Sequence, residues 1–125
     1  MRYLFIHQNF PGQFRHVAKV LADDPSNEVI GIGEAPNLKS RPALHARIRV
    51  LSHQPHGSAH KETHHYLRDF EGHLRRGQTV VRLLLKLRDE DGFQPDVIVA
   101  HPGWGEGLFL KDIFPNAKIT QYFEY

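Results

Sequence analysis

The stretch that most constrains the fold is the short apolar segment Asp96–Ala100, with β-branched residues at its centre, followed directly by the loop sequence HPGWGEG at residues 101–107. Val and Ile bounded by turn-forming residues predict a short strand that is buried on both faces, as in a parallel sheet. The proline and glycines of the loop then turn the chain sharply. Open α/β sheets bind ligands in loops that leave the carboxyl ends of their strands, so residues 101–107 form a candidate site.

The beginning of the chain repeats this arrangement. Tyr3–Ile6 predicts a strand, and it leads through the loop sequence HQNFPGQ at residues 7–13 into a helix. Each of the two junctions therefore starts with a histidine, His7 in the first and His101 in the second.

The remaining hydrophobic pattern predicts alternating strands and helices. We expect strands at residues 2–7, 28–32, 46–51, 96–100 and 117–125, and helices at residues 12–23, 61–89 and 105–113. This alternation predicts a three-layer α/β fold with a parallel sheet. Right-handed crossovers favour the strand order 3-2-1-4-5, in which the first and fourth strands are neighbours whose crossovers leave in opposite directions. The two histidine-led loops should then face each other at this switch point.

Length and composition exclude several function classes. With 125 residues, the chain is sufficient for one domain, which we expect to span residues 1–125. A net charge of +2 argues against a nucleic-acid-binding surface, and the lack of cysteine excludes disulfides and thiolate chemistry. No apolar run is long enough to span a membrane, and we expect a cytoplasmic protein. Because a predicted strand continues to the last residue, we expect the chain to be part of a longer polypeptide.

The first junction has the chemistry of a site for a hydroxyl-rich ligand. Gly12 alone does not make the three-glycine dinucleotide motif, so a classical NAD site is not expected. The helix start offers free backbone N–H groups, and the loop adds four neutral polar side chains: His7, Gln8, Asn9 and Gln13. The structural alternative for Asn9 is a helix N-cap.

The second junction offers four candidates. His101 can bind a ligand hydroxyl or act as a base, unless it is simply packed against backbone. Trp104 suits a sugar ring or the core, and Gly103 allows the backbone to approach a ligand closely. Glu106 is expected in the first turn of the following helix, where the helix dipole favours a carboxylate.

Ten histidines raise the question of a metal site. His60 and His64 would share a helix face, as metal ligands often do. No cysteine joins them, and Glu62 points off that face, so we expect no metal site.

Two longer segments resemble the amino-terminal domain of family 4 glycosyltransferases: Phe5–Phe14 and Asp96–Glu106. The stretches Thr63–Tyr66 and Arg76–Gln78 also resemble that group. The resemblance implies a Rossmann-like domain, the acceptor-side half of a retaining GT-B enzyme, whose carboxyl-terminal donor domain with paired glutamates is absent from this sequence. It further implies a nucleotide-sugar donor, an acceptor of unknown identity and no cofactor or metal.

Some residue roles follow from the resemblance alone. It matches Gly12 to the loop that approaches the donor phosphates, and His101 to the histidine beside the transferred sugar, which makes His101 the catalytic candidate. His64 becomes an acceptor-side candidate. The present chain alone is expected to be inactive, and peripheral membrane association remains open. The competing hypotheses are a flavodoxin-like ligand-binding module and a histidine-based metal-binding protein.

Overall fold

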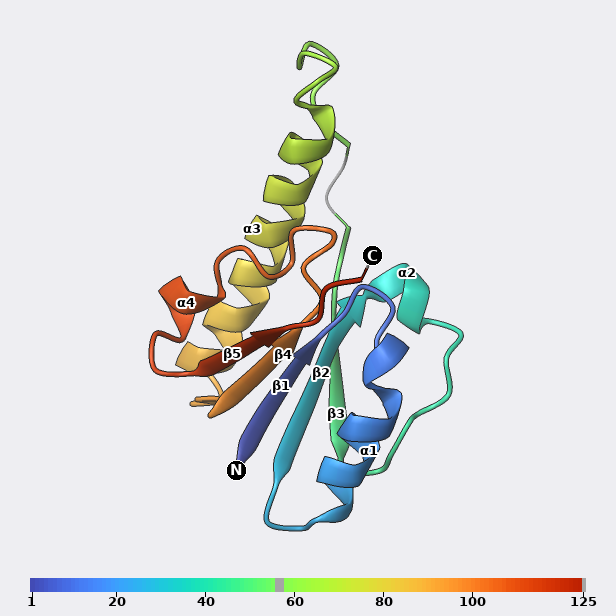
Figure 1. The fold of residues 1–125 in the computed structure, drawn as a ribbon, viewed down its shortest axis with the longest axis vertical. Coiled ribbons are helices and arrows are strands. Elements are labelled where there is room, and N and C mark those ends of the chain that lie inside the picture. The colour runs from blue at the N-terminus through green and yellow to red at the C-terminus, as the bar shows by residue number, and fades with distance from the viewer. Residues whose placement is uncertain (56–57, 125) are drawn as a thin grey trace.

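The computed structural model describes residues 1–55 and 58–124, which form a five-stranded parallel sheet with helices packed against it (Figure 1). The strands are β1 (Arg2–Ile6), β2 (Glu28–Glu34), β3 (Ile48–His53), β4 (Val97–Ala100) and β5 (Lys118–Gln121). Their order across the sheet is β3-β2-β1-β4-β5, and every neighbouring pair is parallel. The predicted α/β, Rossmann-like fold and its strand order are confirmed.

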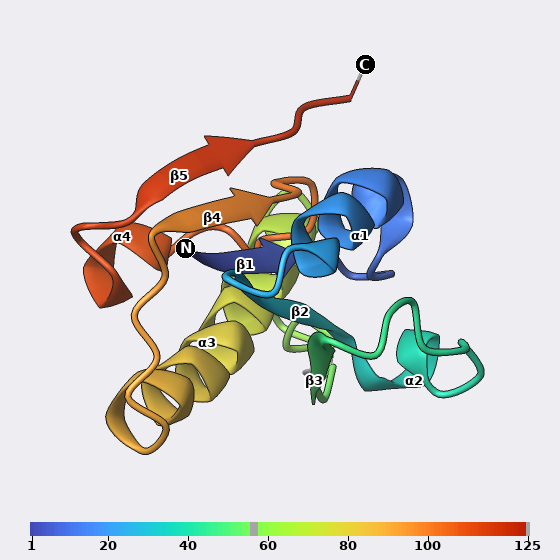
Figure 2. The same cartoon turned by 90° about the horizontal axis from the view of Figure 1, so that it is seen from below.

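Helices cover both faces of the sheet. They are a 3-10 turn (Gly12–Phe14), α1 (Arg15–Asp23), α2 (Ala35–Leu38), α3 (Arg68–Asp89) and α4 (Leu110–Ile113). Figure 2 shows α1 on one side of the sheet and α3 with α4 on the other. None of the helices in the described part of the chain combines the length and the apolarity needed to cross a bilayer.

The central strand β1 explains the layered core. Leu4 and Ile6 pack toward α3 in one apolar cluster, while Phe5, between them, packs toward α1 in a second cluster. Side chains alternate between the two faces of a strand, so a strand covered on both faces must be apolar throughout. This is why the sequence of β1 shows no polar alternation.

The long helix starts later than predicted. We expected a helix over residues 61–89, but α3 begins at Arg68, and the preceding residues form turns. The Glu71 carboxylate accepts hydrogen bonds from the backbone N–H of His60 at 2.6 Å and from the hydroxyl of Thr63 at 3.0 Å. These bonds hold the preceding segment as turns, and they lower the pKa of Glu71, the His60 bond having the larger effect.

The helix expected over residues 105–113 is mostly wrong. Only Leu110–Ile113 is helical, and the residues before it form turns. Gly105 adopts a φ of +93°, which ends any helical path at that point. Its carbonyl oxygen lies 2.8 Å from the position that a side chain on Gly77 of α3 would occupy. The placement of Glu106 in a first helical turn is therefore wrong, and a helix dipole does not account for this carboxylate.

Strand ends also differ from the prediction in a way that matters for the site. The second and third strands were expected to end at residues 32 and 51, but β2 runs to Glu34 and β3 to His53. Register pairs these two end residues with each other. The last strand was expected to reach residue 125, but β5 ends at Gln121, and α2 was not predicted.

Candidate functional site

Four strands of the sheet deliver a histidine or a glutamate to the same edge. His7 follows β1, Glu34 ends β2, His53 ends β3 and His101 follows β4. The backbone N–H of His7 bonds to Ile32 at 3.0 Å, so the parallel ladder continues into the first loop. Because the strands are parallel, all four side chains meet at the carboxyl edge, and each is at least 94% buried.

The rings of His7 and His101 lie side by side, as expected from the strand order. Their centroids are 5.0 Å apart, and the indole of Trp104 stacks on His101 at 4.3 Å with an interplanar angle of 18°. Trp104 also meets the edge of His7 at 5.6 Å. One face of the indole therefore covers His101, and Trp104 is half-buried. The juxtaposition of the two loops is confirmed, while ligand binding by them stays a prediction.

Backbone hydrogen bonds select the tautomer of both rings. The Nδ1 atom of His7 accepts from the N–H of Asn9 at 2.9 Å, and that of His101 accepts from the N–H of Gly103 at 3.2 Å. A neutral ring that accepts at Nδ1 carries its proton at Nε2. Both Nε2 atoms are therefore donors.

These two donors are linked through one glutamine and one carboxylate. His7 donates to Oε1 of Gln13 at 2.6 Å, the amide of Gln13 donates to Glu124, and His101 donates to the other Glu124 oxygen at 3.2 Å. The bond from His101, followed by that from Gln13, lowers the pKa of Glu124. Burial lowers the pKa of His7 below its ordinary value, against an opposing effect of its bond to Gln13. At neutral pH the network therefore contains a neutral His7 and an ionised Glu124.

Protonation of His7 should destabilise the fold. Because its pKa is lower in the folded chain than the unfolded value of about 6.5, the unfolded chain binds more protons at this site. The free energy of unfolding should therefore fall as the pH drops through and below 6.5. His7→Gln removes this proton site, so the variant should lose less stability than the native chain between pH 7.5 and pH 5, as measured by urea denaturation.

The matched control for this experiment is His16→Gln, because His16 is exposed on α1. It should leave the pH dependence of the native chain unchanged. Equal slopes for His7→Gln and the native chain would show that His7 titrates alike in both states. Glu124 contributes in a separate window, since its lowered pKa gives stability that is lost only as the pH falls below about 4.5.

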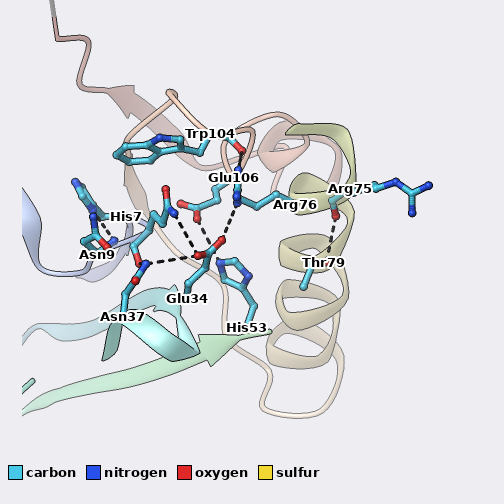
Figure 3. A network of polar contacts seen from close by, with 11 residues as sticks. His7, Asn9, Glu34, Asn37, His53, Arg75, Arg76, Thr79, Trp104 and Glu106 are labelled. Carbon is cyan, nitrogen blue, oxygen red and sulfur yellow. Dashed lines mark hydrogen bonds and ion pairs between the residues drawn. The ribbon is translucent and has the colours of Figure 1, made fainter. Parts of the chain in front are cut away.

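A second polar cluster lies around Glu34. Its Oε1 pairs with Nε of Arg76 at 2.7 Å, and its Oε2 accepts from the amides of Gln8 at 3.2 Å and Asn37 at 3.5 Å (Figure 3). Arg76 also donates to the carbonyl oxygen of Trp104 at 3.0 Å. Arg76 thus ties β2 to the second histidine-led loop, and its guanidinium neutralises the buried Glu34 carboxylate.

The structure also places three further candidate residues of the two junctions, Asn9, Gly12 and Glu106. The N-cap interpretation of Asn9 is wrong, because the helical start after Pro11 has no side-chain cap. Gly12 has a φ of +49° and lies against the ring of His7, so it supports that ring in the present conformation. Glu106 points toward His53, with 3.3 Å between its Oε1 and the Nε2 atom of that ring.

His64 is not brought to this site. It lies in the turns before α3, stacks on His65 with 4.3 Å between ring centroids, and meets the ring of Tyr66 at 5.0 Å. This turn lies at the end of α3 that extends beyond the sheet, at the top of Figure 1. The structure therefore separates His64 from His7 and His101.

Four residues at the carboxyl edge of the sheet were not among the predicted site residues: Glu34, His53, Arg76 and Glu124. Two of them had a usable signal, because Glu34 and His53 each follow an apolar stretch at a strand's carboxyl end. Arg76 lies in the stretch Arg76–Gln78 that resembles the family, but no role followed from that resemblance, and Glu124 had no signal of its own. They reach the site through the packing of α3 and the course of the chain after β5.

The fold and the site together define a class of protein. A parallel sheet with polar residues gathered at its switch point is the architecture of α/β proteins that bind ligands at the carboxyl edge of the sheet. The family model described as the glycosyl transferase family 4 group matches residues 25–125, and the chain belongs to this family. The match includes the loop at residues 101–107 and starts after the loop that contains His7. No curated protein matches the chain.

Proposed function

We propose that this chain forms the acceptor-side half of a GT-B enzyme, which transfers a sugar from a nucleotide-sugar to an acceptor with retention of configuration. Membership of a glycosyltransferase family supports glycosyl transfer in general. The observation that carries the finer proposal is the pair of imidazole rings, His7 and His101, 5.0 Å apart at the switch point. No cofactor takes part in this proposal, and the donor nucleotide-sugar is a substrate.

The chemistry of the two rings suits hydroxyl groups. Each ring uses Nδ1 as an acceptor for backbone and carries an N–H at Nε2. The N–H of His101 can donate to a sugar hydroxyl in place of Glu124, whereas the N–H of His7 is bonded to Gln13, which it orients. In this tautomer His101 has no free ring nitrogen to take a proton. We therefore assign it the role of a positioned hydrogen-bond donor to the transferred sugar rather than that of a base.

Glu124 occupies the place that a ligand hydroxyl would take. Its carboxylate accepts from both His101 and Gln13, while its side chain is 47% exposed. An exposed side chain can be displaced at small cost, whereas the two buried rings are fixed by backbone hydrogen bonds. In the proposed complex, sugar hydroxyls replace the carboxylate as acceptors, and Trp104 shields His101 from water.

The proposal requires a second domain of the same polypeptide. In it, the carboxyl-terminal domain holds most of the nucleotide-sugar, and the two domains together form the cleft. The 125-residue chain alone is therefore expected to release no nucleotide from any nucleotide-sugar. A cytoplasmic location and peripheral membrane association remain predictions.

The test is His101→Ala in the full-length polypeptide. Release of nucleoside diphosphate from a panel of UDP-, GDP- and ADP-sugars should identify the donor, and the variant should lower turnover of that donor at least about tenfold, the usual scale for one lost hydrogen bond to a transferring group. NMR of the anomeric proton of the product tests retention.

His16→Ala is the matched control, because His16 is exposed on α1 and is not a member of the hydrogen-bond network of His7, Gln13, His101 and Glu124. It should keep native turnover. Unchanged turnover in His101→Ala would remove His101 from the mechanism. If the full-length polypeptide released no nucleotide from any donor in the panel, the nucleotide-sugar proposal itself would be wrong.

A further inference from the structure

The side chains of His53 and Glu106 are buried at the carboxyl edge of the sheet. Their side chains are 1% and 0% exposed. Within residues 1–55 and 58–124, neither ring nitrogen of His53 and neither carboxylate oxygen of Glu106 has a hydrogen-bond partner. Burial of a carboxylate without partners costs several kcal/mol, of order 1–3 for each unmade bond and more for a charge.

Glu34 completes a group of three around this pair. In the described part of the chain, Glu34, His53 and Glu106 are the one set of three or more histidine and acidic residues whose ligand atoms all lie within 4.8 Å of one another. Figure 3 shows the three side chains pointing toward a common centre from β2, β3 and the loop after β4. Pairing of the end residues of β2 and β3 brings two of them together, and the turn at Gly105 directs the third.

The formal charges around the cluster are not balanced, and a bound cation would balance them. Two carboxylates face one guanidinium, that of Arg76, which is bound to Glu34 at 2.7 Å. With a neutral imidazole the group carries a net charge of −1, located on Glu106. The Nε2 atom of His53 lies 3.3 Å from Oε1 of the Glu106 carboxylate.

We propose that Glu34, His53 and Glu106 form a binding site for a divalent transition-metal ion of the Zn²⁺ type. One imidazole and two carboxylates are a mixed nitrogen and oxygen set that Zn²⁺ accepts, with metal–ligand distances of about 2.0–2.2 Å. Mg²⁺ fits less well, because it favours oxygen ligands and keeps several of its waters. The ion would bind one ring nitrogen of His53 and the carboxylate of Glu106, and so hold the loop at residues 101–107 against the ends of β2 and β3.

This site differs from the one that the histidine spacing suggests. In the sequence, only the spacing of His60 and His64 suggested metal ligands, and we expected no metal site there. The proposal is also independent of glycosyl transfer, since its readout is binding of the ion alone.

The experiment compares zinc retention in the native chain and three variants. After treatment with EDTA, each protein is dialysed against 1 equivalent of Zn²⁺ and then against metal-free buffer, and bound zinc is counted by mass spectrometry. The native chain should retain about one ion. Glu106→Gln and His53→Gln each remove one ligand while keeping the side-chain volume, and each should weaken binding about 100-fold or more.

The double variant His60→Gln with His64→Gln is the matched control, since both histidines are exposed and lie outside the cluster. It should retain zinc like the native chain. Circular dichroism shows whether the variants fold, and Co²⁺ in place of Zn²⁺ reports ligand geometry through its visible absorption. Loss of those bands in Glu106→Gln, with the bands kept in the control, supports the site.

Three results would overturn the proposal. They are a native chain that retains no zinc, retention that is equal in all the proteins, and loss confined to the His60 and His64 variant.

Discussion

Gly105→Ala is expected to destabilise the fold by about 3–5 kcal/mol, the sum of a strained backbone and an overlap with main-chain atoms. Gly105 has a φ of +93°, a region that residues with a Cβ rarely adopt. An added Cβ would also lie 2.6 Å from the carbonyl carbon of His73 and 2.8 Å from its Cα. These atoms belong to the backbone of α3 and cannot rotate away.

The measurement is urea denaturation followed by circular dichroism at 222 nm. A loss of this size corresponds to a fall in melting temperature of about 10 °C or more. Gly72→Ala is the matched control, because Gly72 lies in α3 next to His73, but an added Cβ there meets no atom of the described residues within 4 Å beyond the helix's own backbone. Helix propensity predicts that it stabilises the chain by up to about 1 kcal/mol. If Gly105→Ala were as stable as the native chain, the packing of this loop on α3 would be wrong.

Phe10→Ala should cost about 3–5 kcal/mol, the range for truncation of a buried aromatic ring. Phe10 is 2% exposed and belongs to the apolar cluster between the sheet and α1. Its ring fills the space beside Gly31 of β2, where an added Cβ would come within 2.5 Å of Cε1. The residue at that position of β2 must therefore be small, and removal of the ring leaves a cavity that a rigid sheet cannot close.

Phe70→Ala is the control for this prediction, because the same substitution is made on a ring that is 61% exposed. Its expected effect is within about 0.5 kcal/mol. Both free energies of unfolding are measured under the same conditions. A larger loss for Phe70 than for Phe10 would show that the end of α3 is covered and that the cluster beside α1 is not part of the core.

The proximity of the two histidine-led loops could be predicted because it follows from local rules. His7 and His101 each follow a strand directly, and the alternation of strands and helices determines which strands are neighbours. A right-handed crossover leaves few arrangements for five strands joined in this way. Proximity of the two rings could therefore be inferred without any knowledge of side-chain packing.

The errors concern features that local patterns do not encode. Glu106 was expected on a helix because apolar residues follow it at helical spacing, but the close approach of Gly105 to α3 keeps that segment as turns. The start of α3 was placed too early because Glu71 reaches back to His60 and Thr63. Both effects depend on contacts between residues that are distant in the chain or that compete with the helix for hydrogen bonds.

By itself, the sequence determined the α/β class, the order of the strands and the two histidine-led loops at the switch point, because hydrophobic periodicity and the handedness of crossovers are local rules. Only the tertiary structure decided that Glu34, His53 and Glu106 meet in a buried group, and that His101 shares a hydrogen-bond network with Gln13 and Glu124. Those contacts depend on register at the strand ends and on the course of loops, which are set by packing of the whole domain.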